Sequence, residues 1–367
     1  MKIWIWLTFL VLVFGCKPKI KINRNKIASI IPYAKYLKVR EGNGFVEVKI
    51  INPDTEEVEK TLILVPRNQG KPAVTSSSEI IQVPIKGMIC LSATQIGMMD
   101  KLNCLSKIKG VSSIKYVYNP DLINAYDKRK IIEVSRIQEM NTKRILESKA
   151  DVICYSGFGQ GPPTEKTLLK VGIHSIPIYD WRENHPLGKL AWIYLISYLT
   201  GKEENAKHYF SFVAKRYNQL AKKAKQNKSK SSVLAGSLIG DSWYLPAGES
   251  YSAKLLKDAG ATYVAANSKG SGSLAISLEK CLKSYKNASI WINPGHPSKN
   301  ELLLASKHYG LFTAFKTGNL FCYTHNSNFF WESSVTEPHK LLSDIIQLTQ
   351  ASNKSANKLY FYKKLVP

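Results

Sequence analysis

The stretch that decides the fold is residues 203–226, which read EENAKHYFSFVAKRYNQLAKKAKQ. Apolar side chains recur in it at intervals of three and four residues, and most other positions are charged or polar. The apolar stripe consists of Ala206, Tyr209, Phe210, Val213, Tyr217 and Leu220. This periodicity predicts one helix of about 36 Å with a single apolar face. Two glutamates open the segment and lysines end it, which suits the helix dipole.

Strand and helix patterns alternate on both sides of this helix. Before it, short apolar runs at 88–91 and 152–155 indicate buried strands, each followed by a helical pattern. After it, runs at 232–237 and 290–292 repeat the arrangement. Such alternation is typical of parallel sheets that helices cover on both faces. The predicted fold class is therefore α/β: two Rossmann-like α/β lobes joined by one long helix, with an N-terminal β-rich extension.

Shifts in composition divide the chain into segments. Residues 17–30 are polar and rich in Lys and Asn, whereas 33–66 contain three β-like runs separated by Gly, Asn and Pro turn signals. We predict a lipoprotein signal at 1–16, a tether at 17–32, the β-rich extension at 33–84, the N-terminal α/β lobe at 85–202, the linking helix at 203–226, the C-terminal α/β lobe at 231–350 and a tail at 351–367.

The first residues have the form of an export signal. A positive start is followed by an apolar run over 3–14, which is too short to span a bilayer comfortably, and then by Gly15 and Cys16. This ending resembles a bacterial lipoprotein cleavage box, which implies that Cys16 carries the lipid. An uncleaved membrane anchor and a plain secretory signal are the alternatives. The expected location is the periplasm, with a lipid anchor as the only contact with the membrane.

Several classes of function lack support in the sequence. The net charge of +25 comes from lysines scattered along the chain, whereas nucleic-acid binding needs a concentrated basic stripe. The five cysteines after Cys16 form no CxxC pair, and the seven histidines form no HExxH motif, so we expect no metal site. No GxSxG, P-loop or dinucleotide fingerprint is present, so we expect no catalytic residue and no cofactor.

Four phrases carry a resemblance that extends over about residues 80–350. They are the strand-like residues 85–91, Gly110-Val111-Ser112-Ser113, the stretch 146–153 in which Ala150 replaces a usual proline, and 247–251 followed by Gly260-Ala261. Their order and spacing resemble the rigid-helix (class III) substrate-binding proteins of ABC importers, which include vitamin B12, haem and ferric-siderophore binding proteins. With its extension and signal, the chain resembles Bacteroidetes-like lipoprotein members of this class.

Ligands of α/β proteins sit beyond the carboxyl ends of parallel strands. Among the segments that follow strands here, Trp181, Trp243 and Trp331 offer aromatic faces for a large flat ligand. Alternatively, they fill the seam between sheet and helices. Arg182 could clamp an anionic carboxylate of a chelate, or it could pair with Glu183.

The resemblance adds further site residues. Tyr155 and Tyr244 match positions at which the vitamin B12 binding protein has ligand-contacting aromatics, and Tyr118 matches a third. Glu165 and Glu249 match the two surface carboxylates, one on each lobe, that pair with arginines of the permease in this class. Each also stands near a predicted helix start, where a carboxylate is favourable in any case.

The sequence thus predicts the substrate-binding component of an ABC importer, which captures an iron chelate (siderophore or haem) or a corrinoid between its lobes. The expected partners are the permease, its ATPase and the chelate, and we expect a monomer. One alternative is an enzyme or chelatase-like protein that handles metal tetrapyrroles on the same scaffold, and another is a structural surface lipoprotein. The sequence does not decide between chelates or give residues 30–80 a role.

Overall fold

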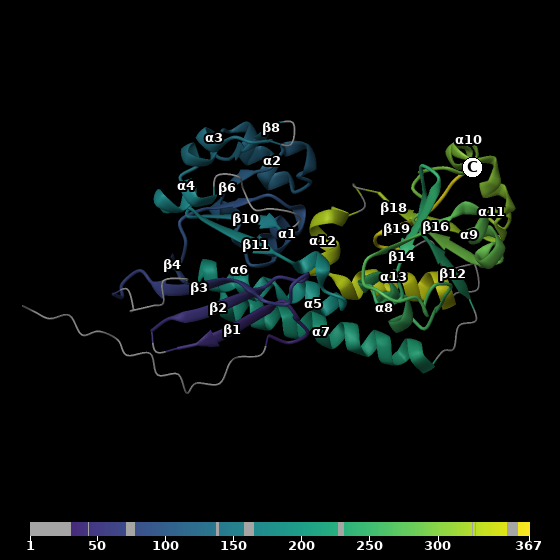
Figure 1. The fold of residues 1–367 in the computed structure, drawn as a ribbon, viewed down its shortest axis with the longest axis horizontal. Helices are drawn as coiled ribbons and strands as arrows, with labels where there is room; N and C mark the ends of the chain where they lie inside the picture. The colour runs from purple at the N-terminus through teal and green to yellow at the C-terminus, as the bar shows by residue number, and fades with distance from the viewer. Residues whose placement is uncertain are drawn as a thin grey trace, which may run out of the picture.

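The computed structural model describes residues 31–367 except 43, 71–77, 137–138, 158–164, 227–230, 325, 327 and 351–358. Two α/β lobes stand side by side, and helix α7 (Glu203–Gln226) runs beneath both of them (Figure 1). The predicted fold class is confirmed, and α7 has the bounds that its apolar stripe indicates. Cys16, the predicted signal and most of the predicted tether lie outside the described residues.

The N-terminal lobe is built on a five-stranded parallel sheet of order β11-β10-β5-β6-β7. Its strands are β5 (Met88–Cys90), β6 (Ile108–Val111), β7 (Ile132–Glu133), β10 (Val152–Ser156) and β11 (His174–Ile178), with a small ribbon of β8 (Ser135–Arg136) and β9 (Glu139–Met140). Its helices are α1 (Ala93–Lys101), α2 (Pro120–Asp127), α3 (Thr142–Glu147), α4 (Glu165–Lys170), α5 (Pro186–Ala191) and α6 (Ile193–Thr200). Trp192 lies between α5 and α6 and separates the two helices.

The C-terminal lobe repeats the plan with the order β15-β12-β17-β18-β19. Its strands are β12 (Ser232–Ala235), β15 (Thr262–Tyr263), β17 (Ile290–Ile292), β18 (Leu320–Tyr323) and β19 (Tyr362–Lys364), of which only β19 runs antiparallel to its neighbour. Its helices are α8 (Tyr251–Asp258), α9 (Leu278–Tyr285), α10 (Lys299–Ala305), α11 (Thr313–Lys316) and α13 (Pro338–Gln350). Strand β19 comes from the segment predicted as a tail, where the buried Asp344 carboxylate accepts hydrogen bonds from the N–H groups of residues 360–362 at 2.6–3.0 Å.

A second, three-stranded antiparallel sheet covers part of the C-terminal lobe. It consists of β13 (Ser237–Ile239), β14 (Ser242–Pro246) and β16 (Ser273–Ser277). Successive side chains of a strand point to opposite faces. Trp243 therefore faces inward and packs on Trp291 and Phe312 at ring-centroid distances of 5.1 and 5.2 Å, while Tyr244 faces solvent.

The N-terminal extension forms a four-stranded sheet of β1 (Leu37–Glu41), β2 (Val46–Ile51), β3 (Val58–Pro66) and β4 (Ser78–Val83). It lies below the N-terminal lobe beside α6 and α7 (Figure 1). Buried residues of β1–β4 belong to the same apolar cluster as both lobes, so the extension is packed rather than appended. The Lys60 ammonium donates to the carbonyl of Ser175 at 2.6 Å and pairs with Glu79, and it thereby covers an edge strand of the lobe.

The lobes meet at a second place besides α7. Helix α12 (Phe330–Thr336) follows a strand of the C-terminal lobe but packs against α1 of the N-terminal lobe (Figure 1). A Cβ built on Gly97 would lie 1.8 Å from the carbonyl oxygen of Glu332, so only glycine permits this approach. The Glu332 carboxylate accepts hydrogen bonds from the N–H groups of Tyr118 and Asn119 at 2.6 and 3.1 Å. Helix α12 therefore fastens one lobe to the other.

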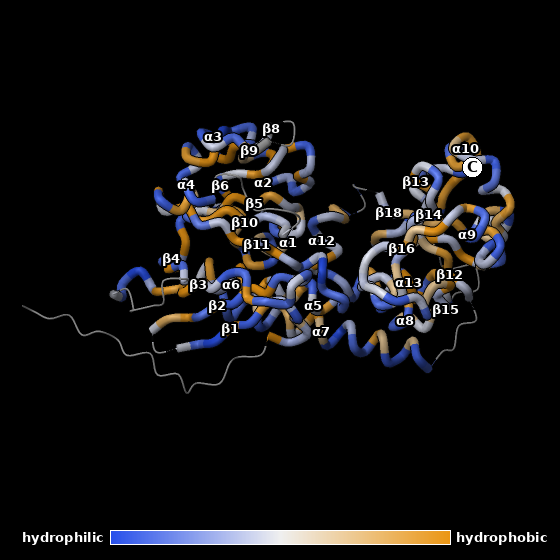
Figure 2. The backbone as a smooth tube through the Cα atoms, viewed as in Figure 1, coloured by the Kyte–Doolittle hydropathy of each residue, from blue (hydrophilic) through white to orange (hydrophobic). Residues whose placement is uncertain are grey.

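Hydrophobic residues concentrate along the strands of both lobes, and α7 alternates between hydrophilic and hydrophobic positions (Figure 2). Of the described helices, none combines the length and the hydrophobicity needed to cross a membrane.

Candidate functional site in the cleft between the lobes

A cavity of about 410 Å³ lies between the two lobes, within the range of sites for small molecules. Its walls come from the carboxyl ends of parallel strands in both sheets, which is where ligands of such sheets bind. Residues at or just after strand ends are Ser92, Ser156 and Asp180 in the N-terminal lobe and Ala235, Gly236, Asn293 and Tyr323 in the C-terminal lobe, and Thr94 joins them from the start of α1.

Aromatic side chains form most of one wall. The Tyr323 ring stacks on Phe330 with a centroid distance of 3.5 Å and an interplanar angle of 7°, and Trp331 meets Tyr323 edge-on at 5.6 Å. Trp181 reaches the same cavity from the N-terminal lobe. The rings hold one another in place, so a flat apolar guest would meet a preformed surface.

Two charged groups lie in this largely apolar space. Burial raises the pKa of Asp180, although the charge of Lys189, the Thr94 side chain and nearby backbone N–H groups stabilise its carboxylate. Burial lowers the pKa of Lys189, whose ammonium lies 4.3 Å from the centre of the Tyr251 ring on the opposite lobe. One buried anion and one buried cation thus share the cavity with the aromatic wall.

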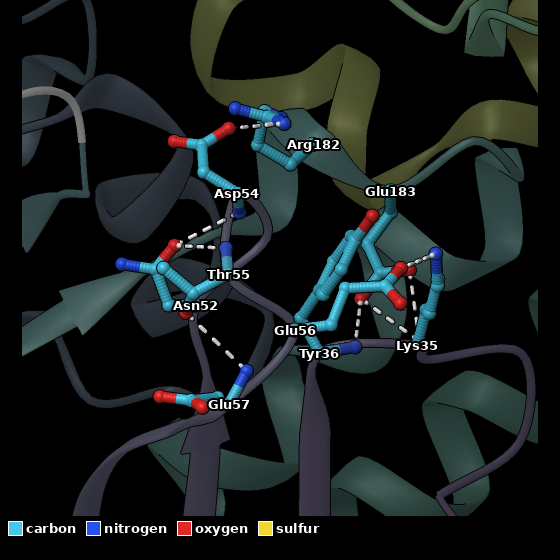
Figure 3. Close-up of polar contacts among 9 residues, drawn as sticks. All are labelled: Lys35, Tyr36, Asn52, Asp54, Thr55, Glu56, Glu57, Arg182 and Glu183. Carbon is cyan, nitrogen blue, oxygen red and sulfur yellow. Dashed lines mark hydrogen bonds and ion pairs between the residues drawn. The ribbon is translucent and has the colours of Figure 1, made fainter.

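The structure brings two of the predicted ligand-binding residues into this cavity. Trp181 and Trp331 line it, and each side chain is more than a third exposed. Arg182 lines a neighbouring hollow of about 510 Å³ together with Trp181. Of the two roles considered for Arg182, the pairing with Glu183 is not seen, because Arg182 pairs instead with Asp54 of the extension at 2.8 Å (Figure 3).

Glu183 turns toward the extension. Its carboxylate accepts hydrogen bonds from the N–H groups of Lys35 and Tyr36 at 2.9–3.2 Å (Figure 3). It also accepts one from the Trp192 indole at 3.2 Å. Burial raises the pKa of Glu183 against the opposing effect of these donors. The segment 180–183, which supplies two cavity residues, is therefore fixed on its far side by residues of the N-terminal extension.

The other predicted aromatics lie away from the cavity. Tyr155 is buried in β10 near carboxylates of the extension, and burial raises its pKa further than those charges do. Trp243 is fully buried in the aromatic cluster of the C-terminal lobe, and Tyr244 points to solvent. Tyr118 is held by its backbone on Glu332. Tyr155 and Trp243 are therefore core residues, whose rings pack inside their lobes.

The two predicted docking carboxylates occupy different environments. Glu165 begins α4 and forms an ion pair with Lys60 of the extension. Glu249 is exposed and accepts a hydrogen bond from the N–H group of Gly270 at 3.0 Å. The Glu165 charge is therefore partly compensated within the chain, whereas that of Glu249 faces solvent.

Several residues of the cavity were missed by sequence reasoning, among them Asp180, Asn293, Lys189 and Tyr362. Asn293 directly follows β17 and Asp180 comes two residues after the end of β11, so their position after a strand could have indicated them. Lys189 sits in an apolar helix with no local signal, and Tyr362 belongs to a strand that was not predicted.

A family model described as periplasmic binding protein matches residues 88–326, from β5 to just beyond β18. The chain belongs to the periplasmic binding protein family. The predicted family is thereby confirmed, and the extension before residue 88 lies outside the matched region.

Two relatives in sequence and two solved structures are similar to this chain over most of its length. Two uncharacterized lipoproteins of Methanocaldococcus jannaschii are 25% and 22% identical, with 94% and 86% of this chain and 87% and 81% of theirs covered. The haem-binding protein HutB of Vibrio cholerae has a TM-score of 0.57 at 15% identity, over 71% of this chain and 97% of its own. The vitamin B12 binding protein of the same organism has a TM-score of 0.55 at 14% identity, over 74% and 99%. The two solved structures share the fold.

Proposed function

We propose that the chain is the substrate-binding component of an ABC importer. It captures an iron chelate (siderophore or haem) or a corrinoid in the cleft and delivers it to a permease with its ATPase. The observation that carries the proposal is the aromatic cavity between the strand ends of the two lobes, which is the kind of place where small molecules bind. The solved structures of similar fold include binding proteins for haem, vitamin B12 and a catecholate siderophore.

We further propose that the protein faces the periplasm on a lipid attached to Cys16. Its two M. jannaschii relatives are named lipoproteins, which supports this anchor. The absorption spectrum of the freshly purified protein tests the proposed function directly, because haem, corrinoids and ferric siderophores are coloured. A chelate band that co-purifies, or that is retained after incubation with one of these compounds, is expected. A protein that retains none of them after separation from free ligand contradicts the proposal.

Removing either cavity tryptophan should weaken chelate binding. Trp181→Ala and Trp331→Ala are each expected to raise the dissociation constant by about tenfold, since each takes away a large preformed contact face. Tyr244→Ala is the matched control, because this aromatic is similarly exposed but lies outside the cavity. Calorimetric titration with the retained chelate measures all three. Equal losses from Tyr244→Ala and Trp331→Ala would contradict the placement of the site.

Docking on the permease gives a separate prediction. The double substitution of Glu165→Lys and Glu249→Lys is expected to abolish chelate uptake by cells while the affinity for the chelate stays unchanged, because complementary charge fixes register at such a contact. Lys60→Met is the control: it frees Glu165 from its internal ion pair, so uptake should persist. Uptake that survives the double reversal would refute the assignment of these carboxylates.

A further inference from the structure

Three polar groups in the cleft have hydrogen-bonding capacity that the protein leaves unused. Among the described residues, neither Asp180 Oδ2 nor Asn293 Oδ1 has a hydrogen-bond partner, although both are buried. The Lys189 ammonium interacts electrostatically with Asp180, but among the described residues it forms no hydrogen bond and no ion pair within 4 Å, and it contacts the Tyr251 ring. All three line one cavity, and they come from two strand ends and a helix.

Leaving such groups unpaired carries a cost in stability. The Asp180 side chain belongs to a residue only 2% exposed, and Asn293 adopts a left-handed backbone conformation with φ of 55°. Unsatisfied polar groups and unusual backbone conformations collect at binding sites, where a ligand supplies what the fold does not. Water can occupy these positions in the empty cleft, so a ligand that displaces it has to replace its hydrogen bonds.

The charges and the hydrogen-bond roles together restrict the guest. One carboxylate and one ammonium nearly cancel, so a ligand with several negative charges would bring uncompensated charge into an apolar space. Two unused acceptors require donors on the ligand, and the ammonium, with three N–H donors, requires oxygen acceptors on it. Haem brings two propionates and no peripheral N–H donor, and a ferric tris-catecholate brings three negative charges.

We propose that the cleft selects an electrically neutral chelate that carries amide N–H groups, with Asp180 and Asn293 as acceptors for these groups and Lys189 as donor to an amide or hydroxamate oxygen. This inference rests on the proposed function and narrows its substrate class. Corrinoids with peripheral carboxamides and neutral ferric trihydroxamates with a peptide backbone both have this chemistry.

The test compares four probes on the purified full-length protein by calorimetric titration: cyanocobalamin, ferrichrome, haem and ferric enterobactin. At least one of the first two is expected to bind about tenfold or more tightly than either of the last two. A wild-type preference for haem or ferric enterobactin overturns the inference while the proposed function stands. Binding of none of the four overturns the proposed function and this inference with it.

Two charge variants separate a ligand contact from a structural role. Asp180→Asn leaves a net positive cavity and should shift selectivity toward the anionic probes, whereas Lys189→Met leaves a net negative one and should shift it away from them. Two variants at exposed positions, Asp127→Asn and Lys207→Met, are the controls, and neither should shift the selectivity. If the methionine variant proves unstable in thermal unfolding, Lys189→Gln replaces it as the variant that removes the positive charge. Shifts in the same direction for both cavity variants, or no shift for either, contradict the proposal.

Discussion

Replacing Gly97 with alanine is expected to lower the free energy of unfolding by roughly 2–4 kcal/mol. The new Cβ would lie 1.8 Å from the Glu332 carbonyl oxygen and 2.7 Å from its carbonyl carbon, so α1 and α12 have to separate. Helix propensity alone predicts the opposite sign, since alanine in a helix interior is more favourable than glycine by about 1 kcal/mol. The sign of the measured change therefore reports on the contact between the lobes.

Denaturant titration of the Gly97 variant measures this change. Gly70→Ala is a suitable control, because nothing lies within 4 Å of the Cβ that it adds. The control should stay within about 0.5 kcal/mol of the wild type. Chelate affinity should fall along with stability in the Gly97 variant, because α12 also carries Trp331 into the cavity. A Gly97 variant as stable as the wild type would mean that the lobes are not fastened here.

Glu183→Ala is expected to cost about 3 kcal/mol or more in stability. The carboxylate is 1% exposed, and its loss leaves the N–H groups of Lys35 and Tyr36 and the Trp192 indole without their acceptor. Glu183→Gln retains one oxygen acceptor, so its loss of stability should be much smaller. Because segment 180–183 rests on this contact, the alanine variant should also bind chelate more weakly, and titration of both variants checks this.

Two results would contradict this role for Glu183. The first is an alanine variant that unfolds at the same denaturant concentration as the wild type. The second is an alanine variant that is destabilised but binds the chelate with unchanged affinity, which would separate the extension from the cleft. Arg182→Met, which removes the exposed ion pair with Asp54, is expected to change stability by only about 0–1 kcal/mol.

The sequence predicted the elements whose pattern is set by burial alone. Helix α7 follows from its apolar stripe, and β5 and β10 follow from short runs that are buried on both faces. Strand β19 was not predicted because it is placed by its pairing with β18 and by the hydrogen bonds from residues 360–362 to Asp344, all made by residues outside its own stretch. Long-range hydrogen bonds of this kind leave no periodic signal.

The site was predicted less well than the fold, for a physical reason. Aromatic residues were taken as ligand contacts, but a tryptophan beside a strand serves equally as core, as Trp243 does. Burial of Asp180 and Lys189 depends on how two distant lobes meet, which no local pattern encodes. The extension had no predicted role, yet Glu183 and Asp54 tie it to the cleft.

The double attachment of the lobes through α7 and α12 has a consequence for transport. Empty and occupied molecules should present almost the same outline, because neither attachment yields without breaking packed contacts. A permease then has little shape difference by which to reject an unloaded carrier. We expect vacant copies to compete with filled ones for the same membrane complex, so overproduction of the protein should slow uptake at limiting chelate.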